Sequence, residues 1–485
     1  MKHAILIMAH KNYTQLRHLV EYFSRDCYVF IHIDKKGEIT PSQANELMGM
    51  ANVTNVYRKY AVHWGGFSIL KCEMFLLKQA LKECDADYIH LISGQDYPIK
   101  PLGCFLRHFE QNAGKDFIRY NIIPNAGWDK YTYSRFQYYY PYDFLSDRGE
   151  KARKTVSRIL SIEKKLGVKR RIPDHFPYLY GSTQWFSLTR SSVEKILDYT
   201  RNHPKFYRRS RFTFASEEYY MATILCNISS KENIIARDLR FIRWKNENNS
   251  YPAILTNEHF RILANSEDFF ARKLEYPQSL SLIENIDKYL LSEENISVGK
   301  TGAWAYKGYQ AFRYDEQLVA AIRRIYVDYG LSSALDIGCG PGQYVSALRL
   351  LGVPIIGFDA NPHTPELSKC ILNNDKDLCV EMDLTENMDE EDAFDLTLCL
   401  DVLPYIPESS LEKAVSNISL LTNKFSFVSW ENDRFRKQGL SVNRNMLEPL
   451  FNKHQMRMNI YLTKEFERLA YVTRKHHEIM VLEKT

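Results

Sequence analysis

Residues 334–345 read ALDIGCGPGQYV, and this stretch decides the fold of the region around it. An apolar run predicts a strand, three glycines follow in a turn, and the residues beyond predict a helix. Glycines let the backbone approach a ligand closely, and free N–H groups at a helix start suit an anion. The spacing is not the GxGxxG of dinucleotide folds, and no P-loop Lys follows. A nucleotide-cofactor domain of another kind is therefore expected here.

Acidic residues follow the next three predicted strands. Asp359 lies in IIGFDAN, Asp383 in CVEMDL and Asp401 in FDLTLCLDVLPYIP. An acid one strand after the glycine turn suits the diol of a ribose. This succession of loops, over about residues 330–485, resembles the class I S-adenosylmethionine (SAM)-dependent methyltransferases.

The resemblance to the methyltransferases implies SAM as cofactor and gives each loop a role. Asp336, Gly338 and Gly340 would line the methionine part of SAM. Asp359 would hold the ribose, Asp383 would lie near the adenine, and Asp401 would lie near the reacting centre. Many small-molecule members carry His where this chain has Tyr405, so a His base is missing at that point. An active methyltransferase and a non-catalytic SAM-binding or docking module both stay open.

Upstream of the glycine turn the sequence predicts a connector. Residues 275–302 contain one short helical pattern, and YDEQLVAAIRRIYVDYG beyond them predicts a helix. We place the domain boundary near 285–300. Trp304, Tyr306 and Lys307 form either a lid over the cofactor or a linker with buried aromatic rings.

The first 275 residues alternate strand and helix patterns. HAILIMAH, CYVFIHID and DYIHLISGQDYP predict strands, whereas YTQLRHLVEYFS and GFSILKCEMFLLKQALKEC have helical apolar spacing. Such alternation predicts an α/β fold with a mostly parallel, doubly wound sheet. Ligands bind at the carboxyl ends of the strands in such sheets, which points to the loops after LIMAH, FIHID and HLISGQD.

Two acidic motifs compete as binding sites. Asp85-Ala86-Asp87 matches the Asp-x-Asp loop with which many nucleotide-sugar transferases hold a metal. It precedes its strand, however, and so predicts a helix-to-strand turn away from the ligand edge. Asp96 follows the same strand at the ligand end and is the better candidate.

RFTFASEEYYMATIL, residues 211–225, supplies a second candidate site. Ser216 is a plausible N-cap, with Glu217 and Glu218 in the first helical turn. The two carboxylates either complement the helix dipole, or one of them is a general base that deprotonates an acceptor hydroxyl. FFARKLE offers Arg272 and Lys273, fixed cations that can replace a metal in stabilising a departing diphosphate.

Seven segments in order resemble the core-2/I-branching β-1,6-N-acetylglucosaminyltransferase family, which includes peptide O-xylosyltransferases. They are LIMAHKNYTQLRHLV, FIHIDKK, VHWGGFSILKCEMFLLKQAL, YIHLISGQDYPIKPL, YGSTQWFSLTRSSVEKIL, SEEYYMATIL and FFARKLE. The resemblance implies inverting, metal-independent transfer from a UDP-sugar, with N-acetylglucosamine the commonest donor sugar and xylose next. It also implies a GT-A-like fold without the metal loop. We therefore expect a glycosyltransferase domain at 1–285, a linker at 286–310 and a methyltransferase-like domain at 311–485.

Carried over residue by residue, the resemblance makes Glu218 the base. Glu217 stands where the family has Asp, and Arg272 and Lys273 would bind the diphosphate. Asp34 would hold the nucleoside, and Asp96, Gln184 and Trp185 would lie near the donor sugar and acceptor. Gln184 replaces an acid that the family often has before this Trp. Because a helix N-terminus lowers a carboxylate's pKa, we expect Glu218 to be ionised at neutral pH.

Composition limits the partners and the cellular compartment that the sequence predicts. A net charge of +5 on 485 residues is too weak to argue for nucleic acid. The nine Cys are scattered without a CxxC pair, which indicates reduced, cytoplasmic usage. No signal peptide or run of about 18 apolar residues is apparent. The basic stretch 148–171 is either a solvated helix or a contact for an anionic membrane surface or acidic acceptor.

Together these patterns predict a bifunctional enzyme that glycosylates and methylates a glycan, for which bacterial surface-polysaccharide synthesis is a fitting setting. One alternative keeps the glycosyltransferase and makes the C-terminal domain a SAM-binding or docking module. A second makes the N-terminal half a carbohydrate-binding module that targets an active methyltransferase.

Overall fold

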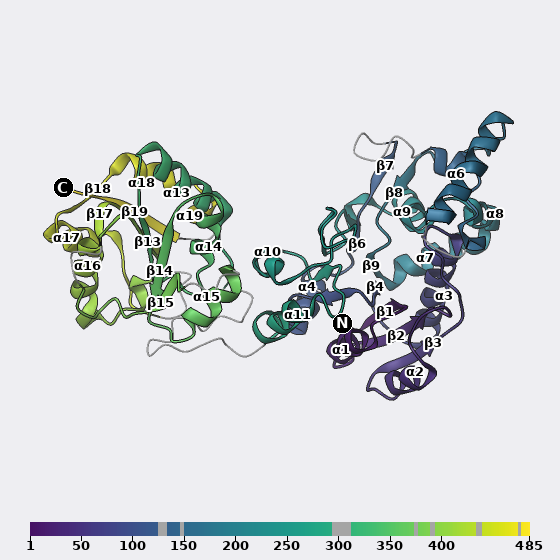
Figure 1. Ribbon diagram of the computed structural model, residues 1–485, viewed down its shortest axis with the longest axis horizontal. Helices are drawn as coiled ribbons and strands as arrows, with labels where there is room; N and C mark the ends of the chain where they lie inside the picture. Colours follow the sequence, from purple (N-terminus) through teal and green to yellow (C-terminus); the bar gives the residue numbers. More distant parts are fainter. Residues whose placement is uncertain are drawn as a thin grey trace. The chain divides into compact units, whose positions relative to one another are not determined.

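The computed structural model describes residues 1–124, 133–145, 150–292, 312–372, 377–388, 393–432, 439–473 and 477–485 (Figure 1). The chain forms two compact units. The first comprises Met1–Leu255 with Glu267–Leu280, and the second comprises Thr256–Ser266 with Ser281–Thr485. A short segment from within the N-terminal region therefore belongs to the second unit.

The first unit is built on a seven-stranded sheet of order β10-β6-β9-β4-β1-β2-β3. Strands β3, β2, β1 and β4 run parallel, and β9 is antiparallel to both β4 and β6. The expected mostly parallel sheet is confirmed, with β9 as the reversed strand. The bounds are β1 His3–Ala9, β2 Tyr28–Ile33, β3 Val53–Tyr57, β4 Tyr88–Ser93, β6 Asp116–Ile118, β9 Phe186–Thr189 and β10 Ile234–Ile235.

Helices cover both faces of this sheet (Figure 1). On one face α3, α7 and α9 pack on one another and on Leu6 and Leu91 of the sheet. On the other, Phe23 of α1 and Phe105 of α4 pack together, and Phe105 contacts the rings of His3 and His90. The helices are α1 Tyr13–Phe23, α2 Pro41–Met48, α3 Phe67–Glu83, α4 Leu102–Gln111, α5 Ser134–Gln137, α6 Glu150–Lys165, α7 Arg190–Asn202, α8 Pro204–Arg209 and α9 Glu217–Ile228.

Two small sheets complete the first unit. One has the order β11-β12-β5, and its antiparallel register places Arg272 opposite Asp96. The other pairs β7 with β8. The bounds are β5 Asp96–Pro98, β7 Asn121–Ile123, β8 Leu179–Gly181, β11 Arg240–Ile242 and β12 Phe270–Arg272.

The second unit is a doubly wound sheet of order β15-β14-β13-β16-β17-β19-β18. Strands β15 to β17 in this order are parallel, and β19 is antiparallel to β17 and β18. The strands are β13 Ala334–Ile337, β14 Ile355–Asp359, β15 Cys379–Glu381, β16 Phe394–Leu400, β17 Thr422–Glu431, β18 Met456–Met458 and β19 His477–Lys484.

Alternation along these strands builds two cores. Phe425 and Phe427 face one core, whereas Val428 and Trp430 face the other. The helices of this unit are α10 Phe260–Asn265, α13 Glu316–Asp328, α14 Gln343–Leu350, α15 Thr364–Leu372, α16 Leu411–Leu420, α17 Arg444–Lys453, α18 Ile460–Phe466 and α19 Ala470–Thr473, with α11 Leu280–Asn285 at the boundary between the units. The predicted architecture of two α/β domains, one Rossmann-like, is confirmed.

Candidate functional sites

The three loops predicted from the sheet edge do meet in the first unit. The amide N–H of Asp34 donates to Ala9 O (2.8 Å) and that of Gly94 to Met8 O (2.9 Å). The buried Gln15 side chain donates to Gly94 O and Leu274 O. Asp34 Oδ1 accepts the amide N–H groups of Lys36 (2.9 Å) and Val62 (3.3 Å), so its carboxylate orders the loop after β2.

Asp85 and Asp87 lie at the amino end of β4, as predicted. Asp85 Oδ2 pairs with Lys2 Nζ (2.6 Å) and its Oδ1 accepts from Tyr28 OH (3.0 Å). Asp87 Oδ2 accepts the amide N–H of Lys2 (2.8 Å). The Asp-x-Asp match is therefore a turn whose two carboxylates bind Lys2 at the N-terminus of the chain. Across the described part of the chain, no three His, Cys, Asp or Glu side chains gather as a metal site.

Asp96 is the centre of a buried ionic cluster. Its Oδ2 pairs with Arg240 Nη2 (3.2 Å) and accepts the amide N–H of Ser93 (2.8 Å), and its Oδ1 pairs with Arg272 Nη1 (3.1 Å). The side chain of Asp96 is 0% exposed, that of Arg240 1% and that of Arg272 18%. The Trp185 ring lies against both guanidinium groups, at 4.8 Å from Arg240 and 4.6 Å from Arg272.

Arg240 was not a sequence candidate. Burial lowers its pKa, and its Nε and Nη1 atoms have no hydrogen-bond partner among the described residues. Arg272 keeps further N–H donors beyond the one bonded to Asp96. Three residues predicted separately for the donor site, Asp96, Trp185 and Arg272, therefore form one contiguous group, and Arg240 extends it.

Lys273, beside Arg272, takes part in a second ionic group. Lys273 Nζ lies 3.5 Å from Glu275 Oε2, and Lys11 Nζ pairs with the other carboxylate oxygen. Burial opposes ionisation of Glu275, but the two lysines outweigh it and hold its pKa below the ordinary value. Lys11 follows β1 at the ligand edge of the sheet. Its ammonium group therefore adds a third cation to Arg272 and Lys273, the two predicted from FFARKLE.

Three carboxyl groups approach one another at the start of α9. Glu218 Oε2 pairs with Arg135 Nη1 (3.2 Å), and the Glu218 side chain is 38% exposed. Burial, and secondly the charge of Glu218, raise the pKa of Glu217 to about 8. Glu73 of α3 is wholly buried, and this burial together with the charge of Glu217 raises its pKa well above the ordinary value. A hydrogen bond from the nearby Gln184 side chain opposes part of this rise.

The expectation of a lowered pKa for Glu218 is wrong. Burial raises the pKa of this carboxyl, and Arg135 only partly offsets the effect. The predicted cap also differs, because Ser216 occupies the N-cap position without a side-chain hydrogen bond to the helix. Desolvation thus outweighs the helix dipole, and it leaves Glu217 neutral and Glu218 more basic than an ordinary glutamate.

The glycine turn of the second unit has the backbone its sequence predicts. Gly338 and Gly340 adopt positive φ values of 69° and 59°, and a Cβ on Gly338 would lie 2.3 Å from Val402 Cγ2. Gly340 donates its amide N–H to Asp359 Oδ2 (3.0 Å), which joins the ends of β13 and β14. Asp383, half-buried after β15, accepts from Thr385 through Oδ1.

The residues of this turn fit SAM. Asp336 is buried, and its Oδ2 has no hydrogen-bond partner among the described residues. Burial raises the pKa of Asp336 well above its ordinary value, with Asp359 adding to the effect. An unbonded carboxyl oxygen beside a glycine turn suits the cationic amino-acid end of SAM, and Asp359 at the end of β14 suits the ribose.

Asp401 lies in a group of side chains that the sequence did not reveal. Its φ is 60°, and its Oδ2 accepts from His477 Nε2 (2.8 Å) and Tyr471 OH (3.0 Å). The rings of Tyr471 and His477 stack at 4.4 Å. Since His477 begins β19, the antiparallel pairing of β19 with β17 brings this imidazole to the carboxyl end of β16. Tyr405, which stands where many related methyltransferases have a His base, lies in a short 3-10 turn.

Some expectations fall outside the described residues. Trp304, Tyr306 and Lys307 lie there, as does most of the expected linker 286–310 and the beginning of the basic stretch 148–171. None of the helices in the described ranges is long and apolar enough to cross a membrane.

Comparison with protein families covers both units. The family model described as Core-2/I-Branching enzyme matches residues 4–264. A model described as a methyltransferase domain matches residues 334–424. The first match spans more than half of the chain.

Named relatives are distant. The xylosyltransferase sqv-6 of Caenorhabditis briggsae is 22% identical over 333 residues, 63% of this chain and 38% of that protein. The beta-glucuronosyltransferase GlcAT14B of Arabidopsis thaliana is 25% identical over 301 residues, 58% of this chain and 64% of that protein. The chain thus spans less than two thirds of the length of either curated relative.

Among solved structures, magnesium protoporphyrin IX methyltransferase from Synechocystis PCC 6803 with bound SAM matches 48% of this chain and 99% of its own, at 15% identity and a TM-score of 0.29. A TehB-like SAM-dependent methyltransferase from Corynebacterium glutamicum matches 34% of this chain and 88% of its own, at 18% identity and a TM-score of 0.28.

Proposed function

We propose that this chain, which belongs to the Core-2/I-Branching enzyme family, transfers a sugar from a UDP donor to a glycan hydroxyl and carries a second, methyl-transferring site. The observation that carries the first activity is the pair of adjacent carboxyls at the start of α9, Glu217 buried and Glu218 partly exposed and paired with Arg135, of which burial raises both pKa values, that of Glu217 to about 8. Environments that separate the pKa values of two neighbouring acids mark acid–base roles.

Glycosyl transfer would proceed as one in-line displacement. Glu218 takes the proton of the acceptor hydroxyl as its oxygen bonds to the anomeric carbon and the bond from that carbon to UDP breaks. Arg272, Lys273 and Lys11 stabilise the charge that develops on the leaving diphosphate. N-acetylglucosamine is the first donor sugar to consider and xylose the second, and the reaction inverts the anomeric centre without a metal.

A screen of UDP-sugars tests this proposal. UDP release from each donor is measured with and without glycan acceptors, in the presence of EDTA. We expect acceptor-dependent release from UDP-N-acetylglucosamine or UDP-xylose. Release that requires an added divalent cation would refute the metal-independent mechanism, and no release from any UDP-sugar would refute the transferase.

The second site would bind SAM through Asp336, Gly338, Gly340 and Asp359, with Asp383 near the adenine. SAM supplies an electrophilic methyl group, and the protein must remove a proton from the acceptor oxygen. Asp401 and His477, hydrogen bonded at 2.8 Å, form an imidazole–carboxylate pair that can take this proton. This pair favours an active methyltransferase over a SAM-binding module, because it supplies the base missing at Tyr405.

Asp359→Ala should weaken SAM binding by at least about tenfold, since a ribose contact and the bond to Gly340 are both lost. Isothermal titration with SAM measures the loss. Asp377→Ala is the matched control, an exposed aspartate of the same unit whose partner is Lys369. Equal SAM affinity in both variants would remove Asp359 from the cofactor site.

His477→Gln should lower methyl transfer by about 100-fold while SAM affinity stays unchanged, because the proton acceptor is lost and the cofactor contacts are not. Formation of S-adenosylhomocysteine with hydroxyl and uronate glycans is the readout. Tyr405→Phe is the comparison variant and should keep its rate. The reverse pattern would assign proton removal to Tyr405.

A further inference from the structure

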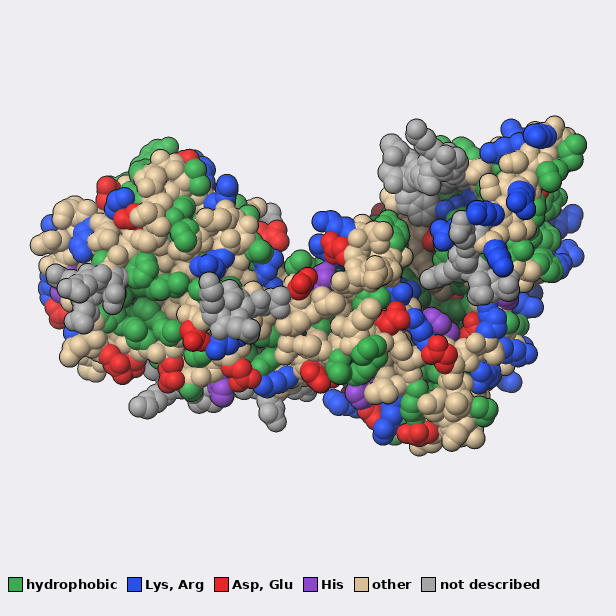
Figure 2. Space-filling model, in the orientation of Figure 1, with side chains coloured by type: hydrophobic (Ala, Val, Ile, Leu, Met, Phe, Trp, Pro, Cys, Tyr) green, Lys and Arg blue, Asp and Glu red, His purple; other side chains and the backbone are tan. Residues whose placement is uncertain are grey.

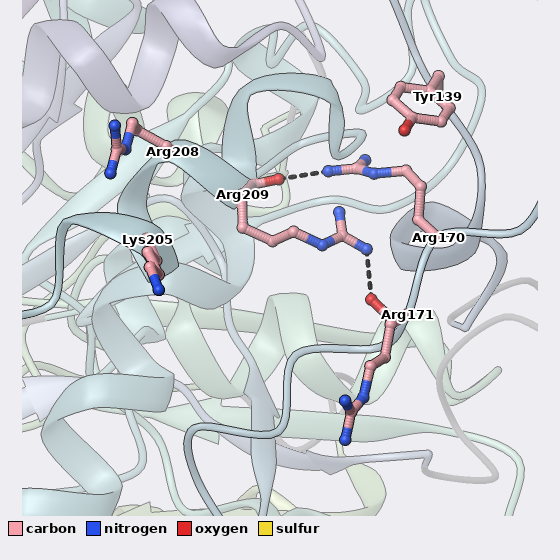
Figure 3. A pocket seen from close by; sticks show the side chains of 6 residues that line it. All are labelled: Tyr139, Arg170, Arg171, Lys205, Arg208 and Arg209. Carbon is pink, nitrogen blue, oxygen red and sulfur yellow. Dashed lines mark hydrogen bonds between the residues drawn. The ribbon is translucent and has the colours of Figure 1, made fainter.

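A cavity of about 450 Å³ in the first unit is lined almost wholly by cations (Figure 3). The lining residues are Tyr139, Arg170, Arg171, Lys205, Arg208 and Arg209. None of the lining residues in the described ranges is a carboxylate. Arg170 and Arg171 follow α6 in the chain, and the other three cations belong to α8, so two separate segments converge on one positive hollow.

The guanidinium groups of Arg170 and Arg209 are fixed by neutral partners. Arg209 Nη2 donates to Phe136 O and Arg171 O, both at 2.6 Å. Arg170 donates to Tyr138 O and Arg209 O, and its guanidinium lies over the Tyr139 ring at 4.8 Å (Figure 3). Carbonyl partners orient these groups without neutralising their charge.

Positive charge in the cavity is balanced at one position. Arg171 pairs with Asp174 (2.6 Å), whereas Arg170, Lys205, Arg208 and Arg209 form no ion pair with any described residue. A second carboxylate, Glu163, accepts the amide N–H of Tyr139 (3.1 Å). Burial also lowers the pKa of Arg209, as expected for a cation deprived of solvent and of a counter-charge. An oxyanion that accepts from these preoriented guanidinium groups would supply the missing counter-charge.

The cavity is joined to the carboxyl site through α5. Arg135 of this helix pairs with Glu218. The carbonyl of Phe136 accepts from Arg209, and that of Gln137 accepts the amide N–H of Arg170 (2.8 Å). The cations expected at the donor diphosphate, Arg272 and Lys273, come from β12 and the residue after it. The cavity is therefore attached to the acceptor base and not to the donor cations.

We propose that this cavity binds an oxyanionic group, carboxylate or phosphate, of the glycan acceptor, so that the enzyme acts on acidic glycans. This inference rests on the proposed glycosyl transfer and names its acceptor class. It also assigns a role to part of the basic stretch 148–171, because the last two residues of that stretch, Arg170 and Arg171, line the cavity.

A phosphate-rich lipid surface offers the same chemistry. Lys and Arg side chains gather over α6 and α8 in Figure 2, and Ile162 of α6 is exposed. The fixed arrangement favours a single acidic group of the acceptor, because backbone carbonyl groups hold the guanidinium groups of Arg170 and Arg209 in place. Vesicle binding therefore belongs among the outcomes of the test.

The test uses the variant Lys205→Ser/Arg208→Ser, since these side chains are exposed and Arg170 and Arg209 support the fold. With UDP saturating the donor site, isothermal titration with oligogalacturonate and with inorganic phosphate should show binding to the native chain. The variant should bind at least one of them about tenfold more weakly. The methyl-esterified oligomer, which is uncharged, should bind both proteins equally. Lys164→Ser/Lys165→Ser on α6 is the control and should match the native chain.

Kinetics provide the second arm. The variant should raise KM for acidic acceptors about tenfold while kcat and KM for the UDP-sugar stay unchanged. Unchanged binding of both anions by the variant would overturn the proposal. So would loss of binding to phosphatidylglycerol vesicles with unchanged affinity for both anions, which would assign the cavity to a membrane. Because anion binding is measured without turnover, it still decides the matter if no sugar transfer is found.

Discussion

Glu218→Gln is expected to abolish sugar transfer and leave binding of the UDP-sugar intact. The amide has nearly the shape of the carboxyl but cannot accept the proton of the acceptor hydroxyl. Loss of a general base lowers turnover by about 10²–10⁴-fold. Initial rates of UDP release measure the effect, and titration with UDP shows that the donor site persists. Glu232→Gln, at an exposed surface glutamate, is the control.

The pH dependence of the native enzyme gives the same prediction a second readout. Because the pKa of Glu218 is raised, protonation begins at a higher pH than for an ordinary glutamate, and protonated Glu218 is inactive as a base. Activity should therefore fall as pH decreases through this raised pKa. Near-normal turnover by Glu218→Gln, with an unchanged acid limb, would exclude Glu218 as the base.

Asp96→Asn is expected to destabilise the first unit by about 3–5 kcal/mol. The substitution keeps the shape of the side chain but leaves the guanidinium of Arg240, 1% exposed, without the carboxylate that is ion-paired to it. Arg272 loses a partner at the same time. Urea unfolding followed by the fluorescence of Trp185 and its neighbours measures the change.

The opposite end of β4 supplies the control for this prediction. Asp85 pairs with Lys2 at exposures of 66% and 57%, and such pairs contribute only about 0–1 kcal/mol. Asp85→Asn should therefore unfold almost as the native chain does. Equal stabilities of the two variants would mean that the Asp96 cluster is not a buried ionic core.

Sequence patterns located the loops of the first site because that information is local. Strand and helix periodicities placed Asp34 and Asp96 at the carboxyl ends of strands, and Asp85 at an amino end. Arg240 and Glu73 could not be found in this way. Arg240 reaches Asp96 only because β11, β12 and β5 pair across the unit. Glu73 is one of several polar residues in the α3 sequence, and nothing in that sequence marks it as buried.

The second unit repeats this lesson. The glycine turn and Asp359 follow from adjacent segments, and they lie together as expected. The partner of Asp401 comes from β19, at the far end of the chain, where a single His carries no motif. The direction of the Glu218 pKa was also beyond the sequence, because desolvation depends on what packs over the helix start.

The most direct test of two active sites in one chain is mass spectrometry of an acidic glycan incubated with a UDP-sugar and SAM. The native chain should add a sugar, and with SAM present also a methyl group. Glu218→Gln should lose sugar addition, whereas Asp359→Ala should methylate more slowly at subsaturating SAM and keep sugar addition. Sugar addition by Glu218→Gln at the native rate, or its loss in Asp359→Ala, would contradict two separate sites.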